Sequence, residues 1–207
     1  SPIGTKGSPM IGMRSDEIAG QVIKGLLNRN KELDVNLIED VSLGCAFPEG
    51  PTGMLVARGA SILAGIPETA AANVINRYCG SAMTSLHMIS SAIEAGDIEV
   101  GIAGGVEDMF TIPQGGFAPD FNVKLAEEDY YISMGEGAEL LADELDISRE
   151  EQEEFSFSSH DKAVAARDAG KFDNEIVPIT LEDGTVIDKD SGPRTCLLYT
   201  SPSPRDV

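Results

Sequence analysis

In the first half of the chain, segments with the apolar spacing of a helix alternate with short apolar segments typical of strands. The four-residue spacing of Ile18, Val22 and Leu26 gives one helix an apolar face, and Ser15 lies where it could cap the first turn. The pattern predicts helices at 15–30, 52–65 and 82–96 and strands at 37–47, 71–79 and 100–106. Repeats of strand, helix and strand imply parallel strands joined by right-handed crossovers. Residues 1–110 are therefore predicted to form a layered α/β domain.

The periodicity changes in the second half of the chain. Residues 111–194 begin with a stretch of Pro, Gly and acidic residues without a sustained period, as is typical of an excursion from a domain. Helical patterns return at 133–145 and 148–170, and the second has Ser148 and Glu151 at the positions of a capping box. We expect this half to form a separate inserted segment.

The end of the chain, residues 195–207, matches neither pattern. Pro202 and Pro204 oppose regular structure, and the apolar residues beside them have no periodic partners. The stretch resembles a translated sequencing adapter, so we leave it, with Cys196, out of the functional interpretation.

Composition and charge exclude several classes of function. The chain has 207 residues, of which 42% are hydrophobic, enough for one sizeable core. Its 35 acidic and 15 basic residues give a formal net charge of −20, which opposes binding to nucleic acid or to an anionic membrane. No apolar run approaches the roughly 18 residues of a membrane span. The three cysteines are far apart, which fits neither a metal site nor a disulfide framework and predicts a cytoplasmic protein.

Cys79 lies at the predicted junction between a strand and a helix. The unpaired N–H groups and the dipole at a helix N-terminus favour the thiolate, which is the nucleophilic form of cysteine. Gly80 and Ser81 follow directly, and their small side chains leave room for a sharp turn and for a ligand beside the sulfur. A buried structural cysteine would fit the same position. Both interpretations stay open on these residues alone.

No histidine is predicted to pair with this thiol. His87 lies eight residues further along the same helix, which is roughly 12 Å away at the helical rise. His160 lies in an acidic helical stretch and is expected to be partly exposed. Cys45 has no activating neighbour and is predicted to pack in the interior. Gly104 and Gly105 lack the flanking residues of a phosphate-binding loop and are expected to permit close strand packing.

Several segments, in the same order and spacing, resemble the thiolase family. "NRYCGSAMTSLH", followed by "AGGVEDM", is similar to the nucleophile segment of that family, and "SPIGTKG" resembles its R-T-P-I-G start without the preceding strand. "SMGEGAELL", "SREEQEEF" and "DNEIVPI" resemble its M-G-x-T-A-E helix, S-R-E-E-Q helix and D-E-I-V-P strand. "DSGPR" matches the approach to the second half of the family's loop domain. The resemblance covers residues 1–194.

The resemblance implies a thiolase-like layered αβα domain with an inserted, here incomplete, loop domain. It implies an acyl-CoA C-acyltransferase that cleaves 3-ketoacyl-CoA in fatty-acid β-oxidation, with Cys79 as the nucleophile and Met134 lining the pantetheine tunnel. Acyl-CoA and CoA are then the substrates, with no cofactor and no metal. A homodimer or tetramer is implied, with a β-oxidation hydratase or dehydrogenase subunit as a candidate partner. Gly137 departs from the family, which usually has Thr there.

The family's C-terminal half carries groups that this chain lacks. In the family, a G-H-P histidine activates the nucleophile, and a second cysteine in a C-x-G motif shuttles the proton. Neither these motifs nor the N-E-A-F segment occur in this sequence. We therefore expect an N-terminal fragment that is inactive by itself.

Two other functions stay open from the sequence. One is a biosynthetic thiolase that forms acetoacetyl-CoA, although Ser133 stands where that branch tends to have His and so favours the degradative branch. The other is a non-catalytic acyl-CoA or lipid carrier built on the same fold, which would need none of the downstream groups.

Overall fold

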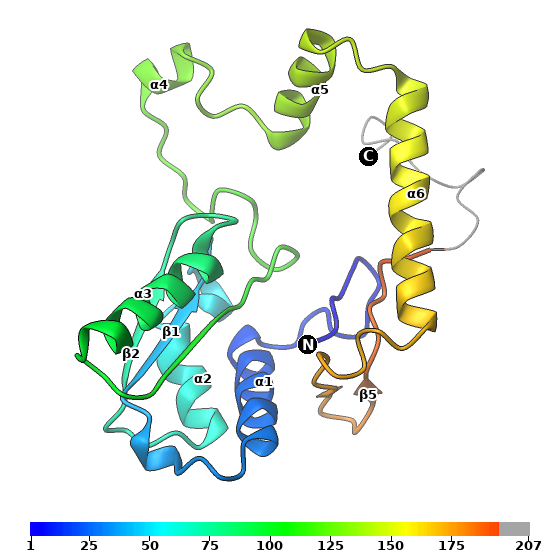
Figure 1. Cartoon of the computed structure of the whole chain (residues 1–207). Coiled ribbons are helices and arrows are strands. Elements are labelled where there is room, and N and C mark those ends of the chain that lie inside the picture. The colour runs from blue at the N-terminus through cyan, green and yellow to red at the C-terminus, as the bar shows by residue number, and fades with distance from the viewer. Residues whose placement is uncertain (195–207) are drawn as a thin grey trace. The chain divides into compact units, whose positions relative to one another are not determined.

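The computed structural model describes residues 1–194 in two compact units (Figure 1). The first unit joins Ser1–Ala118 with Glu175–Ser191, and the second contains Pro119–Asn174 and begins again at Gly192. The first unit contains α1 (Ser15–Arg29), β1 (Asp40–Gly44), α2 (Val56–Ala64), β2 (Ala71–Ile75), α3 (Ser81–Ala95), β3 (Gly101–Gly105), β4 (Ile179–Thr180) and β5 (Val186–Ile187), with 3₁₀ turns at Val35–Leu37 and Gly50–Thr52. The second unit contains α4 (Val123–Glu127), α5 (Met134–Glu144) and α6 (Arg149–Asp168).

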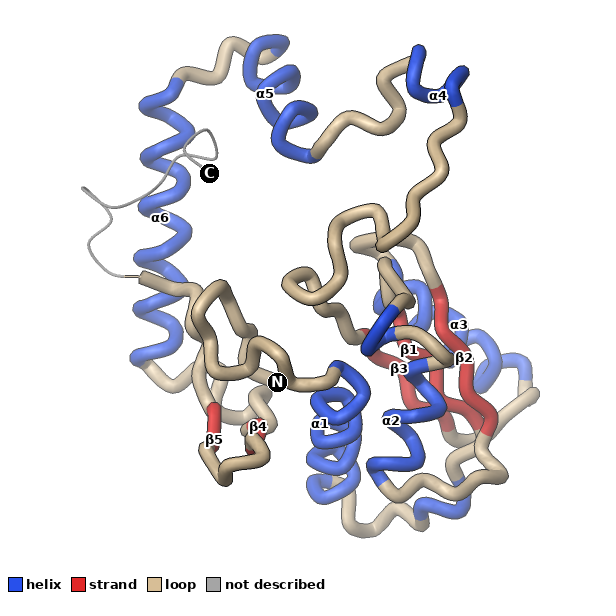
Figure 2. Tube along the Cα trace, turned by 180° about the vertical axis from the view of Figure 1, so that it is seen from behind, coloured by secondary structure: helices blue, strands red, loops and turns tan. Residues whose placement is uncertain are grey.

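Three parallel strands form the main sheet of the first unit, in the order β2–β1–β3. α3 covers one face of this sheet, and α2 lies on the other face with α1 beside it (Figures 1 and 2). Side chains alternate along β1, so that Val41 and Leu43 join the buried cluster with α1 and α2 while Gly44 lies against the start of α3. The predicted layered α/β architecture with parallel strands is confirmed.

The hydrophobic core lies between the sheet and the pair α1 and α2. Ala57 and Ala60 of α2 are fully buried, and their small side chains let the helix approach the strands closely. Burying an aliphatic side chain of the size of Val41 contributes roughly 1.5–3 kcal/mol. The buried cluster consists of Ala19, Ile23, Ile38, Val41, Leu43, Ala57, Ala60, Ala64, Ile66, Ala70 and Ile102.

The C-terminal ends of two helices follow the sequence signals, whereas two predicted starts do not. The helix predicted from residue 52 begins at Val56, after the 3₁₀ turn at Gly50–Thr52. α2 and α3 stop at Gly65 and Gly96, whose φ angles of 86° and 78° are the left-handed values that favour glycine. α1 begins at Ser15 itself, with Arg14 in the N-cap position and no side-chain cap. The predicted role of Ser15 as the N-cap is therefore wrong. Its side chain is buried in the first turn, where packing rather than capping determines its place.

The segment 175–191 returns to the first unit after the excursion. Gln21 of α1 exchanges two hydrogen bonds of 2.9 Å with the backbone of Thr180, and Arg29 donates to the Ile176 carbonyl at 2.8 Å. Ile179 is fully buried. The predicted boundary after residue 110 separates 175–191 from the first domain, whereas these contacts join 175–191 to α1 in the first unit.

The second unit consists of helices with no buried residue in α4, α5 or α6. α5 and α6 each begin with a complete capping box, formed by Ser133 with Glu136 and by Ser148 with Glu151. The predicted box at the start of α6 is confirmed. Among all helices within residues 1–194, none is both long and apolar enough to cross a membrane.

Acidification is expected to weaken the start of α6. Hydrogen bonds from the backbone and hydroxyl of Ser148 lower the pKa of Glu151 below its ordinary value of 4.5. A lowered folded-state pKa means that the contribution to stability is present above 4.5 and is lost as the pH falls through the folded value. An NMR titration of the Glu151 carboxyl group checks this. In the Ser148→Ala variant the pKa of Glu151 should rise toward 4.5. An unchanged titration of Glu151 would contradict the capping interaction.

Candidate active site

Cys79 lies in the turn that joins β2 to α3. β2 ends at Ile75, α3 begins at Ser81, and Gly80 is the N-cap. The predicted strand at 71–79 is therefore too long at its C-terminal end, because the chain leaves the sheet after Ile75. The predicted strand-to-helix junction itself is present. The cysteine is exposed, which contradicts the alternative that it is a buried packing residue.

Hydrogen bonds inside the turn surround a residue with an unusual backbone. Tyr78 has a φ of +46°, a left-handed value that is unfavourable for a bulky side chain. The Ser81 hydroxyl donates to the Tyr78 carbonyl at 2.6 Å and accepts the N–H of Arg77 at 2.8 Å. Oδ1 of Asn76 accepts the N–H of Tyr78 at 3.0 Å. The backbone just before Cys79 is thus held on both sides.

Two glycines let the start of α3 rest directly on the sheet. A Cβ atom on Gly44 would overlap the backbone of Ser81 and Ala82, and one on Gly105 would lie 2.8 Å from the Ala82 Cβ. Close packing is therefore the role of Gly105, as predicted. Because α3 lies so near the strand ends, the turn that carries Cys79 has little freedom to move toward the sheet.

Cys45 follows the neighbouring strand but lies in a different environment. The residue is 1% exposed, and its thiol donates to Oε1 of Glu107 at 3.6 Å. The other carboxylate oxygen of Glu107 accepts the N–H of Ala46 at 2.6 Å. Burial is the main cause that raises the pKa of Cys45 to about 11. Cys45 therefore stays a neutral thiol near pH 7, and its predicted role in packing is confirmed.

Two polar residues at this edge of the sheet were not identified by the sequence patterns. They are Asn76, whose Nδ2 also donates to the Ala46 carbonyl at 2.9 Å, and Glu107. Ser81 was predicted only as a small residue that leaves room, whereas its hydroxyl is hydrogen-bonded inside the turn. A general signal could have found Asn76 and Glu107, because each lies just beyond the carboxyl end of a parallel strand. That edge is where open α/β sheets bind their ligands.

The other predicted residues belong to helices and not to this turn. Met134 is the first residue of α5 in the second unit, where it is 71% exposed. His87 is exposed on α3, nearly two helical turns beyond Ser81. His160 is half-buried on α6, where its Nδ1 accepts the N–H of Arg194 at 3.3 Å. Neither histidine is placed in the turn with the thiol, as the sequence spacing predicted for His87.

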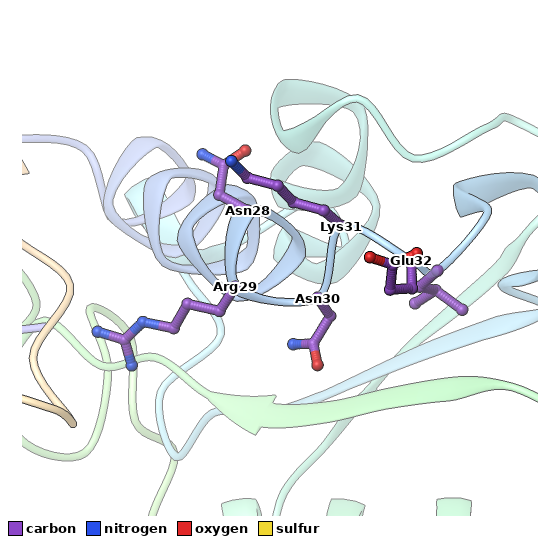
Figure 3. A pocket seen from close by; sticks show the side chains of 6 residues that line it. Asn28, Arg29, Asn30, Lys31 and Glu32 are labelled. Atoms are coloured by element: carbon purple, nitrogen blue, oxygen red, sulfur yellow. The ribbon is translucent and has the colours of Figure 1, made fainter.

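A surface depression of about 620 Å³ lies at the C-terminal end of α1 (Figure 3). Its side chains fan out from the helix end instead of converging on one point. It is lined by Asn28, Arg29, Asn30, Lys31, Glu32 and Leu33, and it does not include Cys79. Residues 1–194 contain no group of three or more His, Cys, Asp or Glu side chains that could hold a metal ion. The chemically informative feature is therefore the exposed thiol.

A family model and several known proteins match most of this chain. The family model described as "Thiolase, N-terminal domain" matches residues 1–199. The chain is 42% identical over 187 residues to a 3-ketoacyl-CoA thiolase of Photobacterium profundum, covering 88% of this chain and 48% of that protein. It is 43% identical over 168 residues to a 3-ketoacyl-CoA thiolase of Aliivibrio salmonicida, covering 80% of this chain and 43% of that protein.

A solved structure extends the similarity to three dimensions. The acetyl-CoA acetyltransferase of Bacillus anthracis aligns with a TM-score of 0.79 at 32% identity, covering 94% of this chain and 53% of that one. The chain thus spans about half the length of the relatives that it matches. The family match over 1–199, together with an exposed cysteine between a parallel strand and the helix on its sheet, shows that this chain belongs to the thiolase family.

Proposed function

We propose that the protein containing this chain is an acyl-CoA C-acyltransferase that cleaves 3-ketoacyl-CoA by thiolysis, as in fatty-acid β-oxidation. The observation that carries this proposal is the exposed thiol of Cys79 in the turn before α3. It is supported by the 42% identity to a protein named 3-ketoacyl-CoA thiolase. The buried and protonated Cys45 offers no competing nucleophile nearby.

The proposed reaction has two steps that share the Cys79 sulfur. The thiolate attacks the 3-keto carbon, the bond between C2 and C3 breaks, and the shortened acyl group remains on the sulfur as a thioester. The electron pair leaves with acetyl-CoA as an enolate, which takes up one proton. A second CoA thiol then loses its proton and attacks the thioester, which releases the shortened acyl-CoA and restores the cysteine.

Other groups are needed to move protons and to hold the developing negative charge. The enolate needs hydrogen-bond donors aimed at its oxygen, and the thiol needs a base. His87 is a poor base for Cys79 because it lies well along α3. We therefore propose that the base comes from the part of the protein that corresponds to the other half of the relatives. We also propose Met134 as part of the pantetheine tunnel and CoA thioesters as substrates, with no resident cofactor.

A biosynthetic thiolase is the second candidate. The structural neighbour from Bacillus anthracis is named an acetyl-CoA acetyltransferase, and the same steps run in reverse would join two acyl-CoA molecules. The higher identity to proteins named 3-ketoacyl-CoA thiolase favours the degradative direction. The non-catalytic carrier, the cytoplasmic location, the homo-oligomer and a β-oxidation partner subunit stay predictions from the sequence.

Alkylation of the two thiols tests the proposed nucleophile. In the protein expressed from its complete reading frame, iodoacetamide should modify Cys79 at least about tenfold faster than Cys45, because thiolate character and access control cysteine reactivity. A saturating 3-ketoacyl-CoA should protect Cys79 and leave the slow rate at Cys45 unchanged. Mass spectrometry of the two peptides measures both rates in one sample. Equal rates, or no protection by substrate, would contradict the proposal.

A further inference from the structure

We propose that Ser81 is a positioning residue for the thiol of Cys79, an inference that rests on the proposed function. Ser81 is the first residue of α3 and is 4% exposed. Its hydroxyl uses both of its hydrogen-bonding roles inside the turn, as a donor to Tyr78 and as an acceptor from Arg77. Its backbone N–H also donates to the Tyr78 carbonyl, at 3.0 Å.

The Ser81 hydroxyl is hydrogen-bonded to Tyr78, the strained residue next to Cys79. Tyr78 directly precedes Cys79 and has a left-handed φ of +46°. A non-glycine residue persists in that region only when its surroundings over-determine it. Three of the surrounding hydrogen bonds end on Tyr78 itself: its carbonyl accepts from the hydroxyl and from the backbone N–H of Ser81, and its N–H donates to Asn76. Its ring also lies 6.1 Å from the ring of Phe47.

The direction of the Cys79 side chain depends on this arrangement. The peptide bond between Tyr78 and Cys79 carries the carbonyl that Ser81 binds. If the hydroxyl is removed, the carbonyl keeps only its bond from the Ser81 N–H and Arg77 loses an acceptor, so the peptide can rotate further as Tyr78 relaxes toward negative φ, and the sulfur moves with it. Attack on a carbonyl requires the reacting atoms at about 3–3.5 Å in alignment, and a 1 Å displacement can lower a rate about a hundredfold.

Ser81→Ala is therefore expected to lower kcat of thiolysis about 10-fold to 100-fold, with KM changed less than about twofold. Ser85→Ala is the matched control. Ser85 is buried on the same helix, and its hydroxyl donates at 2.8 Å to the carbonyls of Ala82 and Gly104, outside the turn. The Ser85→Ala variant should have a lower free energy of unfolding but a kcat close to that of the parent protein. Both variants are measured in the protein expressed from its complete reading frame.

A second substitution tests the strain directly. Asparagine adopts the left-handed region more readily than tyrosine, so Ser81→Ala should lower kcat much less in a Tyr78→Asn background than in the parent protein. A hydroxyl that served only the stability of α3 would show no such coupling. Slow alkylation of Cys45 reports that each variant is folded, because that thiol is buried.

The outcomes separate this inference from the proposed function. If Cys79→Ala retains thiolysis, the proposed function fails. If Cys79→Ala is inactive but Ser81→Ala keeps the kcat of Ser85→Ala, only the positioning role is overturned. If Ser81→Ala unfolds, the double variant decides, because recovery of both folding and kcat supports the role. A double variant that stays unfolded, or that folds without recovering kcat, overturns it.

Discussion

Cys79→Ala is expected to lower the rate of thiolysis by about 10⁴-fold or more, because removing a covalent nucleophile removes the intermediate that divides the reaction into two steps. Binding of acyl-CoA should change little, since the alanine keeps the Cβ and the exposed turn. The absorbance of an enolised 3-ketoacyl-CoA follows the cleavage, and a short incubation with radiolabelled substrate measures the acyl-enzyme. Both signals should disappear in the variant.

Cys45→Ala is the matched control for this variant. Like Cys79→Ala, it removes one sulfur atom. This sulfur belongs to a buried thiol that follows β1 and donates a hydrogen bond to Glu107. We expect kcat near that of the parent protein, with a loss in the free energy of unfolding of about 1 kcal/mol from lost packing. If Cys45→Ala were as inactive as Cys79→Ala, or if Cys79→Ala kept more than about a tenth of the activity, the assignment of the nucleophile would be wrong.

Gly44→Ala is expected to lower the free energy of unfolding by about 3 kcal/mol or more. The new Cβ atom would overlap the backbone of Ser81 and Ala82, and backbone atoms cannot swing aside as a flexible side chain can. α3 would have to move away from the end of β1. Urea denaturation followed by circular dichroism measures the change, and faster alkylation of Cys45 would show that the sheet edge has opened.

Gly59→Ala is the control for the glycine substitution. Gly59 lies within α2, and its new Cβ atom would lie at an ordinary 3.7 Å from the Cβ of Asp16. Because alanine favours the helix over glycine, the free energy of unfolding should rise by up to about 1 kcal/mol. Opposite signs in the two variants would confirm that close approach, and not glycine content, determines the effect. A neutral Gly44→Ala would contradict the close packing of α3 on the sheet.

Gly44 and Ser81 lie at the same edge of the sheet. Gly44 determines how near the start of α3 comes to β1, and Ser81 connects that start to the backbone before Cys79. A substitution that moves α3 should therefore also change the reactivity of the thiol. The packing of α3 on the sheet therefore also determines the position of the Cys79 thiol.

The sequence by itself determined the features that depend on local periodicity and local chemistry. Alternating apolar periods predicted the layered α/β fold and its parallel strands, because a strand or helix must bury the same face wherever it packs. Gly65, Gly96 and the capping box of Ser148 marked helix ends, since those signals act within a few residues. The order of the motifs was enough to predict the family, and the junction at Cys79 followed from both.

Only the tertiary structure decided what depends on residues far apart in the chain. The return of 175–191 to α1, the burial of Ser15 in place of its predicted cap, and the exposure of Cys79 all depend on packing between distant segments. The sequence predicted that Cys45 is buried, but it left open whether Cys79 is buried or exposed. One is covered and bonded to Glu107 while the other stands in a strained turn, because contacts across the sheet, and not neighbours along the chain, determine exposure.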